Sequence, residues 1–338
     1  MLIDGKLSRH DIAGIVADAQ AHEADGYDGF WSAETAYDAF LPLVLAAEHT
    51  ERIQLGTGIT VAFGRSPMQT AYVAHDIQAM SGGRFILGLG SQVKPHIERR
   101  YSMPWSQPAL RMREYISALQ AIWASWDRGE KLDFRGDFYT HTLMPPFFAP
   151  EPNAAPPKVH LAAVGEGMTE VAGEVADGML VHAFSTERYM REVTLPALER
   201  GLAKSGRTRA DVELSMPAFI VTGTTEEELA AAKQGTRDQI AFYGSTPSYK
   251  GVLELHGWDD LHVELNRLSR SGRPEAWREM GDLIDDEMLD AFAVVAKPDE
   301  VGAAVTKRYD GLLDRFSFYA PYEHDSSLFD GIVRSLKT

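Results

Sequence analysis

Four short segments place small and polar residues directly after apolar runs, where a ligand can approach the backbone. They are Ala33-Glu34-Thr35, Thr57-Gly58-Ile59-Thr60, Gly88-Leu89-Gly90-Ser91-Gln92 and Ala163-Val164-Gly165. Because glycine has no side chain, a flat ring or a phosphate can come close to backbone N–H groups at such positions. Glycine also ends strands for structural reasons alone, but the concurrence of four segments favours a ligand. We therefore expect these segments to bind a small molecule.

Familiar nucleotide and hydrolase motifs do not account for these segments. The run FILGLG at residues 85–90 resembles the start of a dinucleotide-binding fingerprint, but the third glycine is missing because position 93 is Val93. The chain also has no P-loop lysine, no G-x-S-x-G nucleophile elbow, no HExxH and no His-x-His pair. It contains 0 cysteines, which excludes disulfides and thiolate chemistry. We expect no metal site.

Composition narrows the class of protein further. The chain has 338 residues, with 33 basic against 49 acidic side chains and a formal net charge of −16. This charge argues against a nucleic-acid or anionic-membrane binder, since both need a basic surface. No apolar run approaches the roughly 20 residues of a membrane span, and the N-terminus lacks a signal-peptide pattern. We expect a soluble cytoplasmic protein that acts on a small-molecule substrate.

The elements that carry these segments repeat along the chain. Helix-like stretches end in Asp-Gly or Gly-Gly and lead at once into apolar runs, as at residues 24–33, 81–90, 176–184 and 309–320. Eight strands are expected, near residues 1–5, 28–33, 53–61, 84–90, 158–163, 178–183, 212–222 and 315–320. Eight strand–helix units predict an α/β fold, a (β/α)8 TIM barrel in one domain over residues 1–338. In such a barrel the site lies at the C-terminal strand ends.

Two long segments interrupt the strand–helix alternation. Residues 129–157 read as a short hairpin and a proline-rich loop, after the helix that follows strand 4. Residues 244–292 are acidic and partly helical, and they precede strand 8. Both exceed ordinary connections, so we interpret them as insertions that shape or cover the site.

Two helices are predicted in more detail. Ser66 followed by Pro67 forms a good N-cap and first turn for a helix that runs to about Met80. Residues 111–126 place large apolar side chains at spacings of three and four, which predicts one buried face: Met112, Tyr115, Ile116, Leu119, Ile122, Trp123 and Trp126.

A local excess of positive charge surrounds the third segment. Arg84, Lys94, Arg99 and Arg100 face only one acid, Glu98, between residues 84 and 100. In so acidic a chain this excess beside a strand end suits the anionic tail of a cofactor. A solvated, basic start of a helix is the alternative.

The order and spacing of several motifs resemble a known family. YDGFWSAET, LGTGITVAFGRSP, SGGRFILGLGSQ and VHLAAVG followed by EVAGEVADG resemble the bacterial luciferase-like monooxygenase superfamily, and within it the branch that depends on coenzyme F420, a deazaflavin. The resemblance covers nearly the whole chain and weakens over residues 244–292. It implies an oxidoreductase that transfers a hydride between bound F420 and an organic substrate. It also implies a homodimer.

The resemblance assigns roles to particular residues. It implies a non-prolyl cis peptide bond at Gly58–Ile59, behind the central ring of the cofactor; an ordinary trans bond is the alternative. Cofactor contacts carry over to these positions: Thr57, Gly58, Ile59, Gly90, Ser91, Gln92, Val93, His96, Val164 and Gly165. Val164-Gly165 corresponds to the phosphate site, where the N-terminus of a helix can bind an anion. Glu34 and His96 are the candidate catalytic residues, although a cofactor hydrogen bond is the alternative role of His96.

Two departures from the family pattern limit the prediction of a substrate. The sugar-phosphate dehydrogenases of this family have a histidine where this chain has Thr35 and a glutamate where it has Val93. That substrate class is therefore not expected. Two other functions stay open at this point: a monooxygenase that uses flavin mononucleotide (FMN) in a two-component system, and a non-catalytic barrel that binds a ligand.

Overall fold

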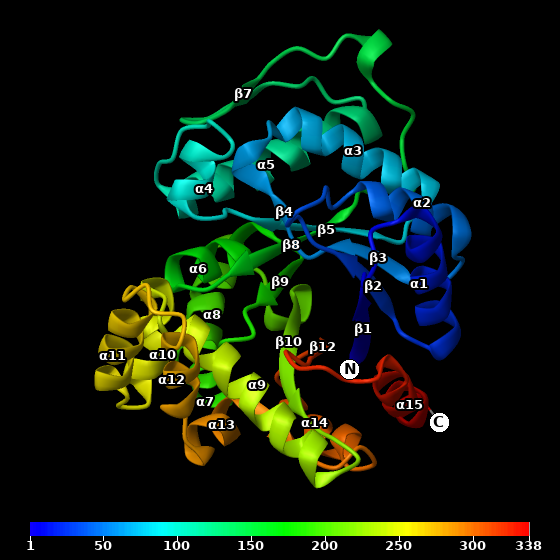
Figure 1. The fold of residues 1–338 in the computed structure, drawn as a ribbon. Helices are drawn as coiled ribbons and strands as arrows, with labels where there is room; N and C mark the ends of the chain where they lie inside the picture. Colours follow the sequence, from blue (N-terminus) through cyan, green and yellow to red (C-terminus); the bar gives the residue numbers. More distant parts are fainter. Residues whose placement is uncertain (338) are drawn as a thin grey trace. The chain divides into compact units, whose positions relative to one another are not determined.

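Strands and helices alternate along the chain as the sequence predicts, and the fold is a (β/α)8 TIM barrel (Figure 1). The computed structural model describes residues 1–337. Eight parallel strands form the barrel: β1 (Leu2–Lys6), β2 (Gly29–Ser32), β3 (Gln54–Thr57), β5 (Phe85–Gly90), β8 (Lys158–Ala163), β9 (Gly178–Val181), β10 (Glu213–Val221) and β12 (Arg315–Tyr319). Two shorter strands, β4 (Thr60–Val61) and β11 (Ala293–Val295), pair with β5 and β10.

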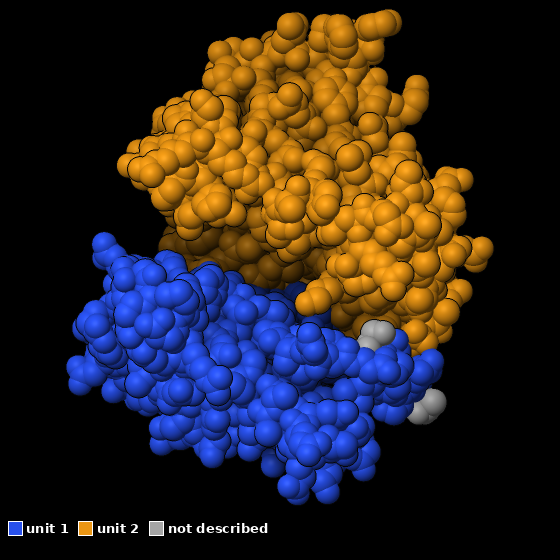
Figure 2. Space-filling model, viewed as in Figure 1, with its two compact units in different colours: residues 1, 181–196, 214–338 blue, residues 2–180, 197–213 orange. Residues whose placement is uncertain are grey.

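The chain divides into two compact units, coloured separately in Figure 2. The larger comprises residues 2–180 and 197–213, and its strands follow the order β1-β2-β3-β5-β8-β9. Its helices are α1 (Ile12–Asp25), α2 (Leu41–His49), α3 (Pro67–Met80), α4 (Lys94–Arg99), α5 (Pro108–Asp127), α6 (Glu166–Val175) and most of α8 (Leu195–Ser205). We call it the N-terminal unit.

The second unit, which we call the C-terminal unit, comprises residues 1, 181–196 and 214–338. Its strands follow the order β11-β10-β12. Its helices are α7 (Glu187–Tyr189), α9 (Glu226–Gly244), α10 (Lys250–Leu255), α11 (Asp259–Ser269), α12 (Ala276–Asp282), α13 (Asp286–Phe292), α14 (Val301–Tyr309) and α15 (Ser326–Lys337). None of the helices in the described part of the chain is long and apolar enough to cross a membrane.

Both helices predicted in detail are confirmed. Ser66 caps α3, since its Oγ accepts from Gln69 N at 3.2 Å and Pro67 occupies the first turn. The predicted face of α5 is fully buried, with Tyr115 and Ile116 among its inaccessible side chains. These two helices pack against each other on the N-terminal unit. They support the strands that precede the candidate site.

The first insertion lies along α3 and α5. It contains the predicted hairpin, in which β6 (Phe134–Arg135) pairs with β7 (Thr140–His141). The proline-rich part is tied to α3 through its carbonyl groups, because Tyr72 Oη donates to Phe148 O at 2.6 Å and Gln78 Nε2 to Ala155 O at 3.2 Å. Figure 1 shows this segment arching over the outer side of the two helices. These hydrogen bonds place the proline-rich part beside α3, and its role in shaping or covering the site stays a prediction.

The second insertion folds as four helices that share a hydrophobic core with other parts of the C-terminal unit. Residues 244–292 contain α10 to α13, whose buried side chains join Phe184 and Phe219 in one hydrophobic cluster. Leu253, Leu265 and Met280 are nearly inaccessible in this cluster. The insertion is therefore a packed layer of the C-terminal unit.

Candidate functional site

The four segments predicted to bind a ligand follow neighbouring strands of the N-terminal unit. β2 pairs with β3, β3 and β4 pair with β5, and β5 pairs with β8, all in parallel. Ser32 lies opposite Thr57, and Val61 lies opposite Gly90. Because parallel strands end at the same edge, Glu34, Gly58, Gly90 and Gly165 belong to one row of strand ends. The predicted grouping of these segments is confirmed.

The strand predicted over residues 53–61 is broken in two. The peptide bond between Gly58 and Ile59 is cis, which confirms the prediction made from the resemblance. β3 ends at Thr57 and β4 begins at Thr60. Backbone hydrogen bonds hold both sides of the break, since Gly58 N donates to Ser32 O at 2.8 Å and Glu34 N donates to Ile59 O at 2.9 Å.

The glycines of these strand ends differ in the space around them. A Cβ on Gly88 would lie 1.7 Å from Thr57 O, and a Cβ on Gly90 would lie 2.7 Å from Ile59 Cδ1. Protein atoms thus already fill the space beside both glycines. A Cβ on Gly165 would meet no atom within 4 Å. Gly165 matches the expectation of open backbone, whereas Gly88 and Gly90 are glycine because β5 packs closely on β3 and Ile59.

Thr57 connects β3 to β5 through its side-chain hydroxyl. Its hydroxyl donates to Gly88 O at 2.8 Å and accepts from Gly88 N at 2.8 Å, and the residue is inaccessible. Its hydroxyl is thus engaged within the protein, and its role in cofactor binding stays a prediction. The observed role of Thr57 is to hold the two strands together.

Glu34 is a buried carboxylate held by four donors. Its Oε2 accepts from Thr60 Oγ1 at 2.8 Å, Val61 N at 2.9 Å and Arg65 Nη1 at 2.6 Å. Its Oε1 accepts from Tyr101 Oη at 2.5 Å. The side chain is only 6% exposed. Glu34 therefore fixes β4 and the residues after it to the end of β2.

These contacts determine the protonation state of Glu34. Burial alone raises the pKa of its carboxyl, but hydrogen bonds from Tyr101, Val61 and Thr60 and the charge of Arg65 outweigh burial and hold the pKa below its usual value. Burial and the bond to Glu34 raise the pKa of Tyr101 to about 12. At neutral pH Glu34 is thus ionised and Tyr101 protonated. This arrangement favours a positioning role for Glu34, and its catalytic role stays a prediction.

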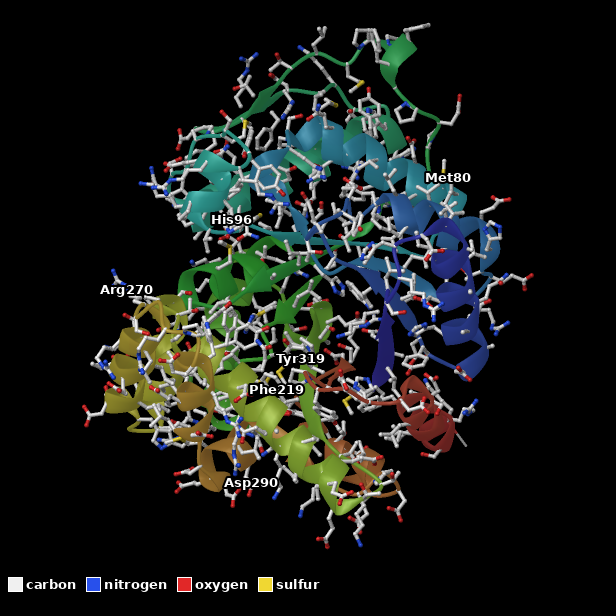
Figure 3. All side chains as sticks on the ribbon, in the orientation of Figure 1. Met80, His96, Phe219, Arg270, Asp290 and Tyr319 are labelled. Atoms are coloured by element: carbon white, nitrogen blue, oxygen red, sulfur yellow. The ribbon has the colours of Figure 1, made fainter. Side chains whose placement is uncertain are left out.

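The segment after β5 forms a turn that leads into α4. Gln92 has a left-handed φ of 58°, and its side-chain Oε1 accepts from Val93 N at 3.0 Å. Ser91 Oγ donates to Gln92 O at 3.1 Å. Val93 is half exposed, and His96 lies exposed on α4 (Figure 3). These residues are accessible to a ligand, so their predicted cofactor contacts are compatible with the structure but untested.

The basic residues near β5 are mostly engaged elsewhere, which corrects their interpretation as a set. Arg84 precedes the strand and binds carbonyl groups of the segment between α2 and β3, including Thr50 O at 2.8 Å and Ile53 O at 2.7 Å. Arg100 donates to Thr35 O at 2.8 Å and lies over the ring of Tyr101. Lys94 and Arg99 are exposed on α4. Arg84 and Arg100 therefore stabilise the fold, whereas Lys94 lies 3.8 Å from Glu98 on α4 and Arg99 is exposed.

Val164 and Gly165 lead directly into α6. Gly165 is the N-cap of this ten-residue helix, with φ of −94°, and is exposed. The first N–H groups of a helix have no partner within it, and its N-terminus attracts anions. The acidic residue of the first turn, Glu166, is turned to Arg200 at 2.6 Å on the outer face. The N-terminus of α6 thus presents free backbone donors at an open glycine.

Comparison with known proteins identifies the family. Residues 3–315 match the model of the luciferase-like monooxygenase family. The chain belongs to this family. It is 55% identical over 314 residues to an uncharacterized protein from Mycobacterium tuberculosis (93% of this chain, 91% of the relative), and 29% identical over 299 residues to a putative coenzyme F420-dependent oxidoreductase from the same species (83% of each).

Solved structures of the luciferase-like family share the fold. The coenzyme F420-dependent tetrahydromethanopterin reductase from Methanopyrus kandleri superimposes with a TM-score of 0.76 at 21% identity, covering 98% of this chain and 95% of its own. The EDTA monooxygenase from Chelativorans sp. superimposes with a TM-score of 0.77 at 14% identity, covering 100% and 93%. Family membership makes the chain an oxidoreductase, so the alternative of a non-catalytic barrel is set aside.

Sequence reasoning missed a group of polar aromatic residues in the C-terminal unit. His182 directly follows β9 and stacks on Tyr249, with ring centroids 4.5 Å apart. Tyr319 is the last residue of β12, and its hydroxyl lies 2.9 Å from that of Tyr243. The strand predicted near 178–183 includes His182, whereas β9 ends at Val181 and leaves His182 directly after the strand. We call His182, Tyr243, Tyr249 and Tyr319 the tyrosine–histidine cluster.

Proposed function

We propose that this luciferase-like protein is an F420-dependent oxidoreductase that transfers a hydride between the bound deazaflavin and a small organic substrate. The observation that carries the proposal is the open backbone at Val164-Gly165, ahead of α6 and in the same row of strand ends as Ile59 and Gly90. A helix N-terminus with an open glycine suits a phosphate, and the row beside it suits a flat ring. The F420-dependent relatives support the choice of cofactor.

The residues present fit such a cofactor. Gly165 leaves room for a phosphate that a side chain would occupy, and the N–H groups of Glu166 and Gly167 follow it at the start of α6. The side chain of Ile59 packs against Gly90, since a Cβ there would lie 2.7 Å from Ile59 Cδ1, and it adds an apolar surface to the row of strand ends. When bound, the deazaflavin supplies hydride chemistry, and the protein supplies orientation. Glu34, Arg65 and Tyr101 keep β4 in position.

An FMN-dependent monooxygenase is the second candidate function. The same phosphate site suits FMN, and a monooxygenase shares the fold with a TM-score of 0.77. We rank it second because a putative F420-dependent enzyme is a relative at 29% identity.

As the resemblance implies, we also propose that the enzyme is a homodimer.

The two functions are separated by titration of the apoprotein with F420 and with FMN, followed by the fluorescence of each cofactor. We expect F420 to bind at least about tenfold more tightly, which corresponds to about 1.4 kcal/mol. Tighter binding of FMN, together with oxygen consumption when reduced FMN is supplied, would reject the F420-dependent function. Binding of neither cofactor would reject both.

A further inference from the structure

The C-terminal unit contains a cavity of about 390 Å³ that the proposed function leaves without a role. Its wall is formed by α7 and the helical turn after it, the end of α10, and the last turns of α13 and α14 (Figure 1). Most of the lining residues are charged or titratable: Glu187, Arg188, Arg191, Glu192, His256 and Arg308. Cavities of this size hold small molecules.

The cavity is positive although the chain as a whole is acidic. Its lining includes three guanidinium groups and two carboxylates. Burial and the nearby charge of Arg188 lower the pKa of His256, so the imidazole ring is neutral at pH 7. Glu287 lies close enough to act on His256 but does not line the cavity. The lining thus keeps a positive excess in a chain of formal net charge −16, which suits a ligand with negative charge.

Arg188 and Arg191 are three residues apart and therefore neighbours on one face of their helix. Each is held through Nε alone, since Arg188 Nε donates to Glu192 Oε1 at 3.0 Å and Arg191 Nε donates to Glu187 Oε1 at 2.9 Å. Their terminal Nη groups donate to no residue that the structure describes. Both side chains are half exposed, so a ligand can reach these groups. The two Nη pairs are planar forks that match the oxygens of an anion.

The helix that carries these arginines has an unusual turn at the same place. α7 continues through a π-helical turn, Met190–Thr194, into α8, and Leu195 N donates to Met190 O across it. Single π-helical turns are rare and occur frequently at functional sites. The start of α7 is fixed as well, because Thr186 Oγ1 lies 2.8 Å from His256 Nε2. The helix is thereby held against the end of α10.

Arg308 supplies a third guanidinium in a fixed orientation. Its Nη1 donates to Ala293 O at 2.6 Å, and its Nη2 donates to Asp290 O. Carbonyl oxygens carry no net charge, and no carboxylate in the described part of the chain forms an ion pair with Arg308. Its positive charge is therefore not neutralised. Because the group is already held in place, little ordering is required when an anion binds.

We infer that this cavity binds a small molecule through a phosphate group, to which Arg188 and Arg191 donate and which Arg308 attracts by its charge. A phosphate carries about −1.5 to −2 charges at neutral pH and has three terminal oxygens, so it can accept from two guanidinium groups at once. The cavity is larger than a phosphate alone, which leaves room for an organic body.

The position of the cavity separates this ligand from a substrate. α13 and α14, which carry Ala291 and Arg308, lead into the N-terminal ends of β11 and β12. TIM-barrel enzymes carry their reaction sites at the opposite, C-terminal strand ends. The cavity is therefore a site for a second ligand, and the inference does not depend on the proposed function.

Calorimetric titration with inorganic phosphate tests the inference, with acetate as the carboxylate probe. The full-length Gly165→Ala variant is titrated, because its methyl group blocks the proposed phosphate position at α6. We expect a dissociation constant for phosphate of about 1 mM or lower, as for two or three charge-assisted hydrogen bonds, and binding of acetate at least about tenfold weaker. Adding Arg188→Gln should weaken phosphate binding at least about tenfold. Arg267→Gln is the matched control, since Arg267 pairs with Glu264 on α11 outside the cavity lining, and it should bind phosphate unchanged.

Protection from phenylglyoxal, which modifies arginine, locates the ligand independently. Phosphate should slow the modification of Arg188 and Arg191 but not that of Arg267, as measured by mass spectrometry of the peptides. Absence of phosphate binding, equal binding of acetate, or equal losses in Arg188→Gln and Arg267→Gln would overturn the inference. So would equal modification of Arg188 with and without phosphate. F420 enters none of these measurements, so the inference and the proposed function can fail separately.

Discussion

Glu34 connects segments that lie far apart along the chain. The sequence places an acid at the end of the second strand, and the structure confirms that position. Its donors lie 26, 27, 31 and 67 residues further along the chain, at Thr60, Val61, Arg65 and Tyr101. No local pattern links residues at such separations, because the fold alone brings them together. The sequence therefore predicted an available carboxylate, whereas the structure shows a fully engaged one.

Replacement of Glu34 by glutamine tests this network. We expect Glu34→Gln to lower the free energy of unfolding at pH 7 by about 2 to 4 kcal/mol. The side-chain NH₂ group of glutamine would face groups that themselves donate hydrogen bonds, and Arg65 would lose its buried carboxylate partner. Urea unfolding followed by circular dichroism measures the change. Asp38→Asn is the matched control, because Asp38 also binds Arg65, at 2.8 Å, but is 36% exposed. The control should cost less than about 1 kcal/mol.

The effect of Glu34→Gln on stability should depend on pH. The pKa of Glu34 is lower in the folded than in the unfolded chain, so its contribution to stability is complete above the unfolded value of about 4.3. It is lost as the pH falls through the folded pKa. The stability difference between wild type and Glu34→Gln should therefore be constant from pH 7 to about pH 5 and shrink below that. A difference that grows on acidification would contradict an ionised Glu34.

At the scale of elements, the repeating pattern predicted the barrel strands closely. The observed strand over residues 158–163 has the predicted bounds, and β5 begins one residue later than predicted. The strand over 53–61 is broken at Gly58–Ile59, a feature that the resemblance implied and that apolar periodicity cannot show. β11 was missed because its three residues follow α13 without a turn. The apolar pattern of the sequence thus predicts long buried strands, but not short strands such as β11, which form through pairing with a neighbouring strand.

The start of α6 gives the prediction that belongs to this scale. Gly165→Ala adds a methyl group that meets no protein atom, at a φ of −94° that alanine adopts freely. We expect cofactor affinity to fall at least about tenfold, since the methyl group occupies the proposed phosphate position. The free energy of unfolding should fall by no more than about 1 kcal/mol, the cost of losing a good N-cap residue. Fluorescence titration and urea unfolding measure the two effects.

A matched substitution separates the site from a general effect of alanine. A Cβ on Gly331 in α15 also meets no atom within 4 Å. Gly331→Ala should bind the cofactor as the wild type does. If Gly165→Ala also binds normally, the phosphate does not lie at the N-terminus of α6, and the proposed cofactor placement is wrong.

At the scale of the whole molecule, the net charge of −16 opposes the anionic cofactor that we propose. The sequence predicts that the basic residues between positions 84 and 100 attract the anionic cofactor in spite of this charge. The structure shows instead that Arg84 and Arg100 bind carbonyl groups of the protein. In the proposed placement, the phosphate meets backbone N–H groups at the start of α6, which carry no net charge and act at close range, where salt screens little. Long-range repulsion and local attraction therefore respond differently to ionic strength.

Salt dependence of cofactor binding follows from this difference. Raising NaCl from 20 to 200 mM shortens the Debye length from about 20 Å to about 7 Å, which screens the repulsion of the acidic surface more than the contacts at Gly165. The dissociation constant of F420 should therefore fall by about twofold, as measured by fluorescence titration. The phosphate-free deazaflavin nucleoside, which is uncharged along its tail, should show no such change. A dissociation constant that rises severalfold with salt would instead place basic side chains on the tail, and Lys94 and Arg99 are the exposed residues of α4 that would supply them.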